Sequence, residues 1–295
     1  MNTLSMVWQY SPITFITFTL ILALIIGSFL NMLIYRLPLI LKRQWREDSQ
    51  QFLEELSQQA PLPEGVFNLW LPRSQCPHCH TTIPFWHNIP VISWLVLRGH
   101  CHHCKAPIGW RYLFVELLSP VLIFSCFNHF GLSEQWFLAC IFTLALLALA
   151  VIDLKTMLLP DQLTLPLLWL GLLINTQQTF VPLSQAVWGA AIGYVFLWLL
   201  YWGFKLLTHK EGMGYGDFKL LAAIGAWFGW QALPMTLLLS SILGALFGIV
   251  LLIKKHSNRH TPLPFGPFLA IGASIYLLAG NTITHWYGLL LGAVY

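Results

Sequence analysis

Long apolar runs joined by short connections are the feature that most constrains how this chain folds. A run of about 20 apolar residues is long enough to cross a bilayer as a helix. Eight such stretches follow one another in the sequence: 13–35, 112–130, 135–152, 162–178, 184–207, 217–232, 234–253 and 264–281. Only 9% of the 295 residues are charged, against roughly 25% in soluble domains. We therefore predict an all-α polytopic membrane protein with about eight transmembrane helices.

The basic residues fall on alternate connections of this predicted topology. All 15 Lys and Arg residues lie within, or beside, the connections between spans 1 and 2, 3 and 4, 5 and 6, and 7 and 8. Because Lys and Arg are enriched in cytoplasmic loops, we predict that these connections face the cytoplasm and that both termini are periplasmic. The first run is too long for the apolar region of a signal peptide and leads into a basic stretch, which predicts a retained anchor.

The connection after the first span is the only long one. We expect a first transmembrane anchor over residues 1–35, a cytoplasmic domain over 36–111, and helices 2–8 over 112–295. The cytoplasmic domain begins with a mixed-charge stretch that is predicted to be helical. Its acidic residues could attract a basic partner, although a solvated helix face is the plainer interpretation; they are Glu47, Asp48, Glu54, Glu55 and Glu64.

Two CxxC motifs follow in the same connection, CPHC at 76–79 and CHHC at 101–104. Paired CxxC turns at this spacing favour a structural zinc site with four thiolate ligands, Cys76, Cys79, Cys101 and Cys104. Four free thiols or a redox pair are the alternatives, and a reducing cytoplasm argues against two disulfides. The neighbouring histidines at 78, 80, 102 and 103 could replace a ligand, but we expect them to support the site or face solvent. Cys126 and Cys140 lie inside spans and are expected to be packing residues.

A few acidic residues stand at the ends of spans: Glu116, Asp153, Asp161, Glu211 and Asp217. A charged side chain at the centre of a spanning helix costs about 2.5–3.5 kcal/mol, so such residues usually face a cavity or a partner. Asp153 ends the third span and Asp217 begins the sixth, which places both on the same predicted side of the membrane. Two carboxyl groups that meet there would share a proton, as in an aspartic protease.

Each of these carboxylates also has a plain structural interpretation. Asp161 follows Pro160, which favours a helix N-cap, and Asp217 could be an N-cap as well. Asp153 could pair with Lys155. Glu116 could pair with a basic residue, Arg111 or Lys105, and Glu211 could be a solvated loop residue. Spacing alone leaves both Asp153 and Asp161 as possible partners of Asp217.

The stretch GMGYGDFKL, residues 212–220, places two glycines just before Asp217. Gly214 and Gly216 have no Cβ, so we expect unusual backbone dihedrals or close approach of another chain there. A peptide to be cut must be extended, because a helix hides its carbonyl groups. The two glycines could therefore let a substrate strand run beside this backbone.

This stretch resembles the GxGD motif of intramembrane aspartyl proteases and, in fuller form, that of the bacterial type IV prepilin peptidases. Four other segments resemble the rest of that family's pattern: GSFLNMLIYRLP (27–38), CPHC…NIPVISWLVLRGHCHHCKAPI, IDLKTMLLPDQLTLP and PFGPFLA (264–270). The similarity runs from about residue 20 to 272 in the same order. The GxGD motif alone is weakly specific, but the whole set is highly specific.

The resemblance implies a bifunctional leader peptidase and N-methyltransferase of the bacterial inner membrane. Such enzymes remove a basic leader from type IV prepilins and type II secretion pseudopilins, and then methylate the new N-terminus with S-adenosylmethionine. It implies Asp153 and Asp217 as the catalytic pair, Asp161 as a structural neighbour, and the zinc loop as an accompaniment of methyl transfer. Gly99 and the 27–38 stretch are carried over as candidate parts of the cofactor site. Two positions depart from the family pattern, Leu113 where proline is usual and His100 where Arg or Lys is usual.

Two other function classes compete with this interpretation. A proton-coupled transporter also uses paired carboxylates in a membrane, but it would favour acidic residues near the midplane and inverted repeats. A zinc-anchored scaffold would need no carboxylates at all. No sequence feature predicts nucleic-acid binding, and no glycine-rich dinucleotide motif marks the cofactor site.

Overall fold

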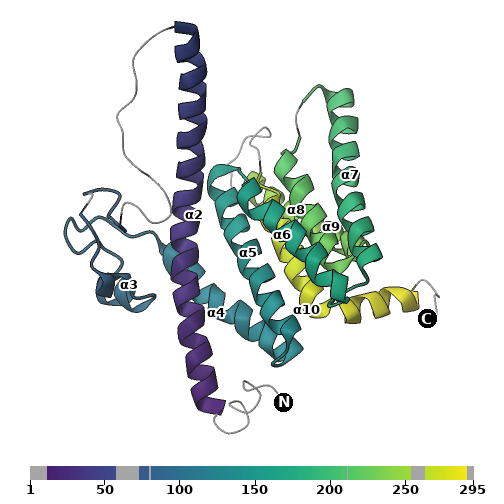
Figure 1. Cartoon of the computed structure of the whole chain (residues 1–295), viewed down its shortest axis with the longest axis horizontal. Helices are drawn as coiled ribbons and strands as arrows, with labels where there is room; N and C mark the ends of the chain where they lie inside the picture. The colour runs from purple at the N-terminus through teal and green to yellow at the C-terminus, as the bar shows by residue number, and fades with distance from the viewer. Residues whose placement is uncertain (1–11, 58–72, 80, 211, 254–262, 291–295) are drawn as a thin grey trace. The chain divides into compact units, whose positions relative to one another are not determined.

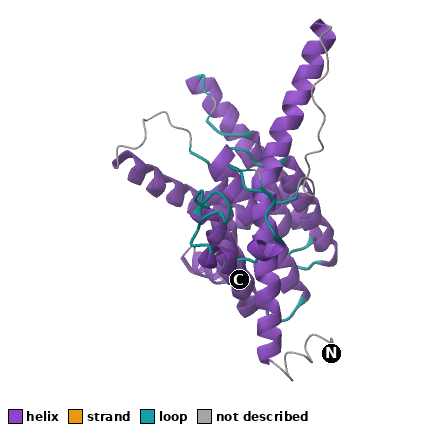
Figure 2. Cartoon of the chain, turned by 90° about the vertical axis from the view of Figure 1, so that its left-hand side faces the viewer, coloured by secondary structure: helices purple, strands orange, loops and turns teal. Residues whose placement is uncertain are grey.

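The computed structural model describes residues 12–57, 73–79, 81–210, 212–253 and 263–290 (Figure 1). The described chain is helical with no strands, as Figure 2 shows, and two isolated β-bridges lie in the cysteine loops. The predicted all-α class is therefore confirmed. The helices are α2 (Pro12–Ser57), α3 (Ile92–Val96), α4 (Trp110–Phe130), α5 (Glu134–Thr156), α6 (Asp161–Ile174), α7 (Leu183–Thr208), α8 (Tyr215–Phe228), α9 (Ala232–Ile253) and α10 (Gly266–Leu290), with 3-10 turns at Phe85–Asn88 and Asn175–Gln177.

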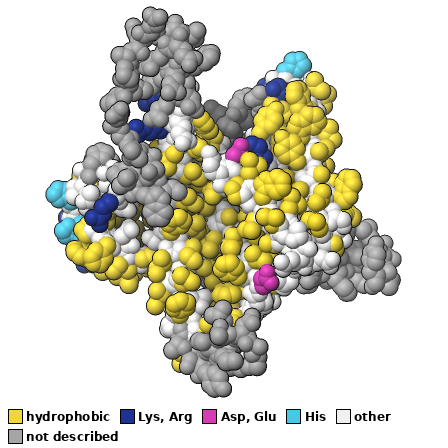
Figure 3. All heavy atoms as spheres, in the orientation of Figure 1, with side chains coloured by type: hydrophobic (Ala, Val, Ile, Leu, Met, Phe, Trp, Pro, Cys, Tyr) yellow, Lys and Arg dark blue, Asp and Glu magenta, His cyan; other side chains and the backbone are white. Residues whose placement is uncertain are grey.

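A helix occurs in each of the eight predicted stretches. Within the described residues, five helices are long and apolar enough to cross a membrane: α2, α4, α5, α7 and α9. The apolar part of α10 is shorter, and α6 and α8 have 14 residues each. At 1.5 Å per residue such a helix measures about 21 Å, less than the roughly 30 Å of a bilayer core. Hydrophobic side chains dominate the face seen in Figure 3, and many large ones are exposed, as expected for lipid contact.

The first helix does not end where the sequence suggested a boundary. α2 continues through Pro38 and residue 35 to Ser57, so the predicted anchor and the predicted mixed-charge helix are one continuous element. The side chains of Glu47, Asp48, Glu54 and Glu55 lie outside the described part of the structure, as does Glu64.

The chain forms two compact units, Met1–Phe124 and Ser125–Tyr295. In the first unit α2 and the start of α4 pack closely. A Cβ placed on Gly27 would lie 3.0 Å from the Ser119 Oγ and 3.1 Å from the Glu116 Cα. The small residue thus allows the two backbones to approach, and the cysteine loops and α3 complete this unit.

In the second unit α8 is the central helix, packed against α6, α7, α9 and α10, while α10 also packs against α5 (Figure 1). Every residue from Asp217 to Phe228 except Lys219 is buried. Gly189 of α7 and Gly225 of α8 bring their helices into backbone contact, so neither position has room for a Cβ. The Trp227 indole N–H donates to the Leu167 carbonyl at 2.8 Å. These contacts fix the position of α8, and with it the position of Asp217.

Candidate active site and metal centre

The four predicted cysteine ligands converge on one point. Their sulfur atoms all lie within 4.8 Å of one another, and the Cys76 and Cys104 sulfurs are 3.7 Å apart. A tetrahedral zinc ion with Zn–S bonds of about 2.3 Å requires sulfurs about 3.8 Å apart. The residues present therefore fit a four-thiolate metal site.

Backbone hydrogen bonds shape each cysteine turn. The Cys76 N–H donates to the Thr81 carbonyl at 3.0 Å, and the Cys101 N–H donates to the Ala106 carbonyl at 2.8 Å. Hydrogen bonds from Thr81 to the sulfur lower the pKa of the Cys79 thiol to about 6, which favours the thiolate that a metal needs. Burial and the neighbouring cysteine sulfurs raise the pKa of the Cys104 thiol to about 11. No cysteine of the chain forms a disulfide. Cys126 and Cys140 are buried, as expected for packing residues.

The histidines beside these cysteines differ in their surroundings. His102 faces His87, with ring centroids 4.8 Å apart, while His80 lies outside the described residues. None of the described histidines belongs to the cluster of four sulfurs. Cysteine is therefore the ligand type that the geometry favours at all four positions.

Asp153 lies in the last turn of α5 and is 5% exposed. One of its carboxylate oxygens, Oδ2, accepts a hydrogen bond of 3.0 Å from the backbone N–H of Gly266. Gly266 is the first residue of α10, and the amide groups of a helix's first turn have no partner within the helix. The start of α10 thus satisfies a carboxylate at the end of α5.

Asp217 lies in the first turn of α8 and is 7% exposed. It is not the N-cap, a position that Gly214 occupies. The Asp217 carboxyl group lies near enough to Asp153 for their charges to repel. Its Oδ1 oxygen is buried and accepts no hydrogen bond from the described residues. An unpaired buried acceptor costs about 1–3 kcal/mol, so an oxygen in this state is suited to receive a water molecule or a substrate group.

Asp161 lies in a different environment from the other two aspartates. Both of its oxygens accept hydrogen bonds of 2.7 Å from the Lys219 ammonium group, and the Asp161 side chain is 50% exposed. The N-cap prediction for Asp161 is wrong: Pro160 is the N-cap of α6 and Asp161 is its first residue. The Asp161 carboxylate instead reaches across to Lys219 of α8.

The two glycines before Asp217 do not have the dihedrals that we expected. Gly214 has φ −85° and ψ 151°, ordinary extended backbone, and a Cβ there would meet no atom closer than 3.9 Å. Gly216 is inside α8, and a Cβ there would lie 2.7 Å from the Leu159 Cβ. The close approach at Gly216 is to Leu159 of the protein's own α5–α6 connection, and the approach of a substrate strand stays a prediction.

Gly99 needs to be glycine for a backbone reason. It has φ +70°, which side chains disfavour, and a Cβ there would lie 3.0 Å from the Trp94 ring.

Glu116 does not have the basic partner that we considered. One oxygen accepts from the Asn31 side-chain amide at 3.2 Å, and the other from the Val91 backbone N–H at 2.8 Å.

Two of the contacts to site residues were not foreseen from the residues themselves. Gly266, which donates to Asp153, and Asn31, which donates to Glu116, lie in PFGPFLA and GSFLNMLIYRLP. Both segments match the family pattern, which is the signal that could have pointed to these contacts. The 27–38 stretch was a candidate part of the cofactor site, whereas 264–270 had no assigned role. Glu211 lies outside the described residues.

Comparisons with known proteins cover both units. The family model described as "Type IV leader peptidase family" matches residues 140–249, and "Bacterial Peptidase A24 N-terminal domain" matches residues 21–130. Proteins named prepilin leader peptidase/N-methyltransferase are 51% identical in Stutzerimonas stutzeri (94% of this chain, 95% of the relative), 52% in Aeromonas hydrophila (95% and 94%) and 47% in Pseudomonas aeruginosa (94% and 94%).

No solved structure matches the chain. The relatives nevertheless align over nearly their whole length and at about half of all positions, which is far more than two or three shared motifs require. Four of the five segments that resembled the family pattern lie inside the two family matches, and PFGPFLA (264–270) follows the second match in the chain. With the paired aspartates and the four converging cysteines, this similarity shows that the chain belongs to the type IV leader peptidase family.

Proposed function

We propose that this chain is a prepilin leader peptidase and N-methyltransferase, with type IV prepilins and type II secretion pseudopilins as its protein substrates. The relatives that carry this name support both activities. The observation that carries the peptidase assignment is the environment of Asp217. Its carboxyl group is buried near that of Asp153 and has an oxygen without a partner among the described residues. A purely structural carboxylate would be expected to have its acceptors satisfied.

Asp153 and Asp217 are proposed to act as an aspartic protease pair. Two neighbouring carboxyl groups in a poorly solvated site ionise together only at high cost, so they hold one proton between them. The ionised group takes a proton from a water molecule, which attacks the scissile carbonyl carbon. The protonated group donates its proton to the carbonyl oxygen. The Gly266 N–H holds the Asp153 carboxylate in place during these steps.

Asp161 is proposed as a structural residue rather than a third member of this pair. It is half exposed and is neutralised by Lys219. An ion pair between α6 and α8 holds the helix that carries Asp217, whereas a carboxylate already bound to a cation is a poor base. Gly216 has a similar supporting role, because it admits Leu159 against the start of α8.

The four cysteines are proposed to hold a structural zinc ion. Four protein ligands leave no position for water, so the metal would order the loop rather than take part in either reaction. S-adenosylmethionine is the proposed methyl donor and supplies a methyl group activated by its sulfonium charge. The chain's own task in that reaction is to bind the donor, hold the new N-terminal amine beside it and keep water out.

We further propose an inner-membrane topology with eight spans and both termini in the periplasm. The domains are an anchor over 1–35, a cytoplasmic part over 36–111 and the protease helices over 112–295, with the active site at the cytoplasmic face. The helices found in all eight predicted stretches support the span count. α8 would span as a short helix buried among its neighbours, and α6, which packs against α8 along one face, would be the second short span.

The test uses full-length protein in detergent and a synthetic prepilin peptide with a basic leader, the cleavage-site Gly–Phe and an apolar segment. Cleavage is followed by mass spectrometry for the wild type, Asp153→Asn, Asp217→Asn and Asp161→Asn, with and without S-adenosylmethionine. We expect no cleavage by the first two variants, cleavage by the third, and a 14-dalton gain on the product when the donor is present. If all three variants cut the peptide like the wild type, the peptidase assignment fails and a proton-coupled transporter becomes the better hypothesis.

A further inference from the structure

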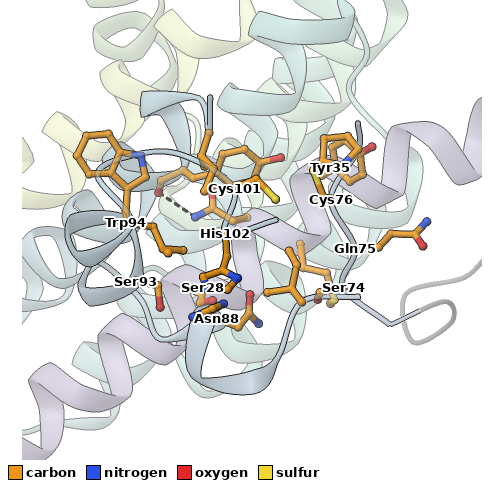
Figure 4. Close-up of a pocket in the computed structure, with 18 of the residues that line it drawn as sticks. Ser28, Tyr35, Ser74, Gln75, Cys76, Asn88, Ser93, Trp94, Cys101 and His102 are labelled. Atoms are coloured by element: carbon orange, nitrogen blue, oxygen red, sulfur yellow. Dashed lines mark hydrogen bonds between the residues drawn. The ribbon is translucent and has the colours of Figure 1, made fainter. Parts of the chain in front are cut away.

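The first unit contains a cavity that the peptidase reaction does not use. Its volume is about 870 Å³, and it is lined by α2, both cysteine loops, α3 and the start of α4 (Figure 4). Small-molecule sites usually have volumes of roughly 300–1,000 Å³. All of the lining residues belong to one compact unit, so the cavity is a feature of this unit alone.

We propose that this cavity binds the methyl donor S-adenosylmethionine, with Glu116 facing its cationic end and Trp94 contacting one of its planar or charged groups. The proposal rests on the proposed function, which requires such a donor. It assigns the donor to side chains in the unit that also carries the zinc cysteines.

Glu116 places a half-buried carboxyl group in the cavity wall. Asn31 and the Val91 N–H each donate one hydrogen bond to it, and neither donor carries a charge. Asn31 is itself buried and held by a second hydrogen bond, from its amide to the Tyr112 carbonyl at 2.9 Å. The carboxylate is thus oriented without being neutralised by these contacts. A ligand that carries both an ammonium and a sulfonium group would complement it.

The backbone at Val91 adds a second sign of a built site. Val91 has φ +62° and ψ −51°, a conformation that is a genuine outlier for a β-branched residue. Strain of this kind clusters at ligand and active sites. Here the strained residue directs its N–H group to Glu116.

Trp94 supplies an aromatic surface with an unused donor. Its indole Nε1 is buried and has no acceptor among the described residues, although a buried tryptophan N–H normally finds one. Gly99 lies against the same ring, and its lack of a Cβ allows this contact. A ligand bearing ribose hydroxyls, ring nitrogens and a carboxylate offers acceptors for this N–H group, and a cation or a planar base can lie over an indole face.

The lining argues for a polar ligand rather than a lipid chain. It includes six side chains with hydrogen-bonding or ionic groups: Asn31, Tyr35, Arg36, Asn88, His102 and Glu116. An acyl chain offers these groups no hydrogen-bonding or ionic partner. A nucleoside linked to an amino acid would instead pair with many of them.

Equilibrium dialysis with tritiated S-adenosylmethionine tests the proposal without any pilin substrate. The proteins are the full-length wild type, Glu116→Gln, Trp94→Ala and the matched control Trp86→Ala. Trp86 is in the same loop but is exposed and does not line the cavity. We expect Kd to rise about tenfold or more for Glu116→Gln and Trp94→Ala, and to stay within about twofold for Trp86→Ala. Zinc content and peptide cleavage report whether each variant is folded.

The outcomes separate this inference from the proposed function. If the wild type binds and transfers the methyl group but both cavity variants bind it equally well, the cavity is not the donor site. The same conclusion follows if Trp86→Ala weakens binding as much as Trp94→Ala does, or if photo-crosslinked label appears only in peptides from residues 125–295. If the wild type cleaves peptides but binds no donor, the methyltransferase part of the proposed function fails instead.

Discussion

Replacing Gly266 by alanine should impair peptide cleavage while leaving methyl transfer intact. A Cβ on Gly266 would lie 2.7 Å from the Asp153 Oδ2 and 3.2 Å from the Leu159 Cδ2. The first contact is closer than real Cβ atoms tolerate, so the carboxylate must move away. That movement stretches or breaks the 3.0 Å hydrogen bond from the Gly266 N–H to the same oxygen. A single methyl group therefore acts directly on one member of the proposed catalytic pair.

The size of the effect follows from that lost hydrogen bond. A hydrogen bond to a charged group contributes about 1.5–3 kcal/mol, and each 1.36 kcal/mol corresponds to a factor of ten in rate. We expect kcat/KM for cleavage to fall by about 10- to 150-fold, mostly through kcat, because the carboxylate is misplaced and not removed. The assay is the initial rate of prepilin-peptide cleavage, followed by mass spectrometry.

Two controls show whether the reasoning about Gly266 is correct. Gly203→Ala places a Cβ where no atom lies within 4 Å, so its cleavage rate should match the wild type. Methylation of a synthetic peptide that already has a free N-terminal phenylalanine should be unchanged in Gly266→Ala, because that reaction needs no aspartate pair. Cleavage by Gly266→Ala within threefold of the wild type would refute the argument, since the Asp153 carboxylate would then tolerate displacement.

Three further predictions follow from other contacts. Asp161→Asn breaks a half-exposed ion pair with Lys219. We expect the free energy of unfolding to fall by less than about 1 kcal/mol and peptide cleavage to persist. A thermal melt checks the stability, and the peptide-cleavage assay checks the activity. In zinc-depleted protein at pH 7, Cys79 should be alkylated by iodoacetamide before Cys104, because hydrogen bonds from Thr81 lower the pKa of Cys79 to about 6, whereas burial and the neighbouring cysteine sulfurs raise that of Cys104 to about 11. Mass mapping checks the order, and added zinc should protect both thiols. Gly225→Ala places a Cβ against the Gly189 backbone and should lower the free energy of unfolding by several kcal/mol. Gly131 has open space around it but φ +60°, so Gly131→Ala should lower the free energy of unfolding by only about 1–2 kcal/mol. Equal melting temperatures for those two glycine variants would contradict the packing of α7 on α8.

Much of the fold could be predicted from the sequence because a membrane limits the choices so strongly. With few charged residues and repeated apolar runs, a helix is the structure that satisfies its own backbone in lipid, and a helix lies in every predicted stretch. The ends of these helices were less predictable. α2 passes the expected boundary at residue 35 because nothing in the following basic stretch stops a helix, and Pro38 is accommodated within it.

The metal site was predictable from local geometry, whereas only the family resemblance, and not spacing, singled out Asp153 and Asp217 among the aspartates. Each CxxC turn aims its two sulfurs by short-range backbone geometry, so the sequence determines the ligands once the two turns meet. Asp153, Asp161 and Asp217 are all acidic residues near span ends, and their order in the chain does not rank them. Only packing separates them: α10 brings the Gly266 N–H to Asp153, while Lys219 turns outward to neutralise Asp161.

The sequence by itself thus determined that the chain is helical and membrane-bound, and which four sulfurs can share a metal, since apolar length and turn geometry act over a few residues. The tertiary structure decided which carboxylates are buried together and how Glu116 is held in the wall of a cavity. Those outcomes depend on contacts between residues as much as 113 positions apart, such as that between Asp153 and Gly266. Contacts of this kind form only when whole helices pack.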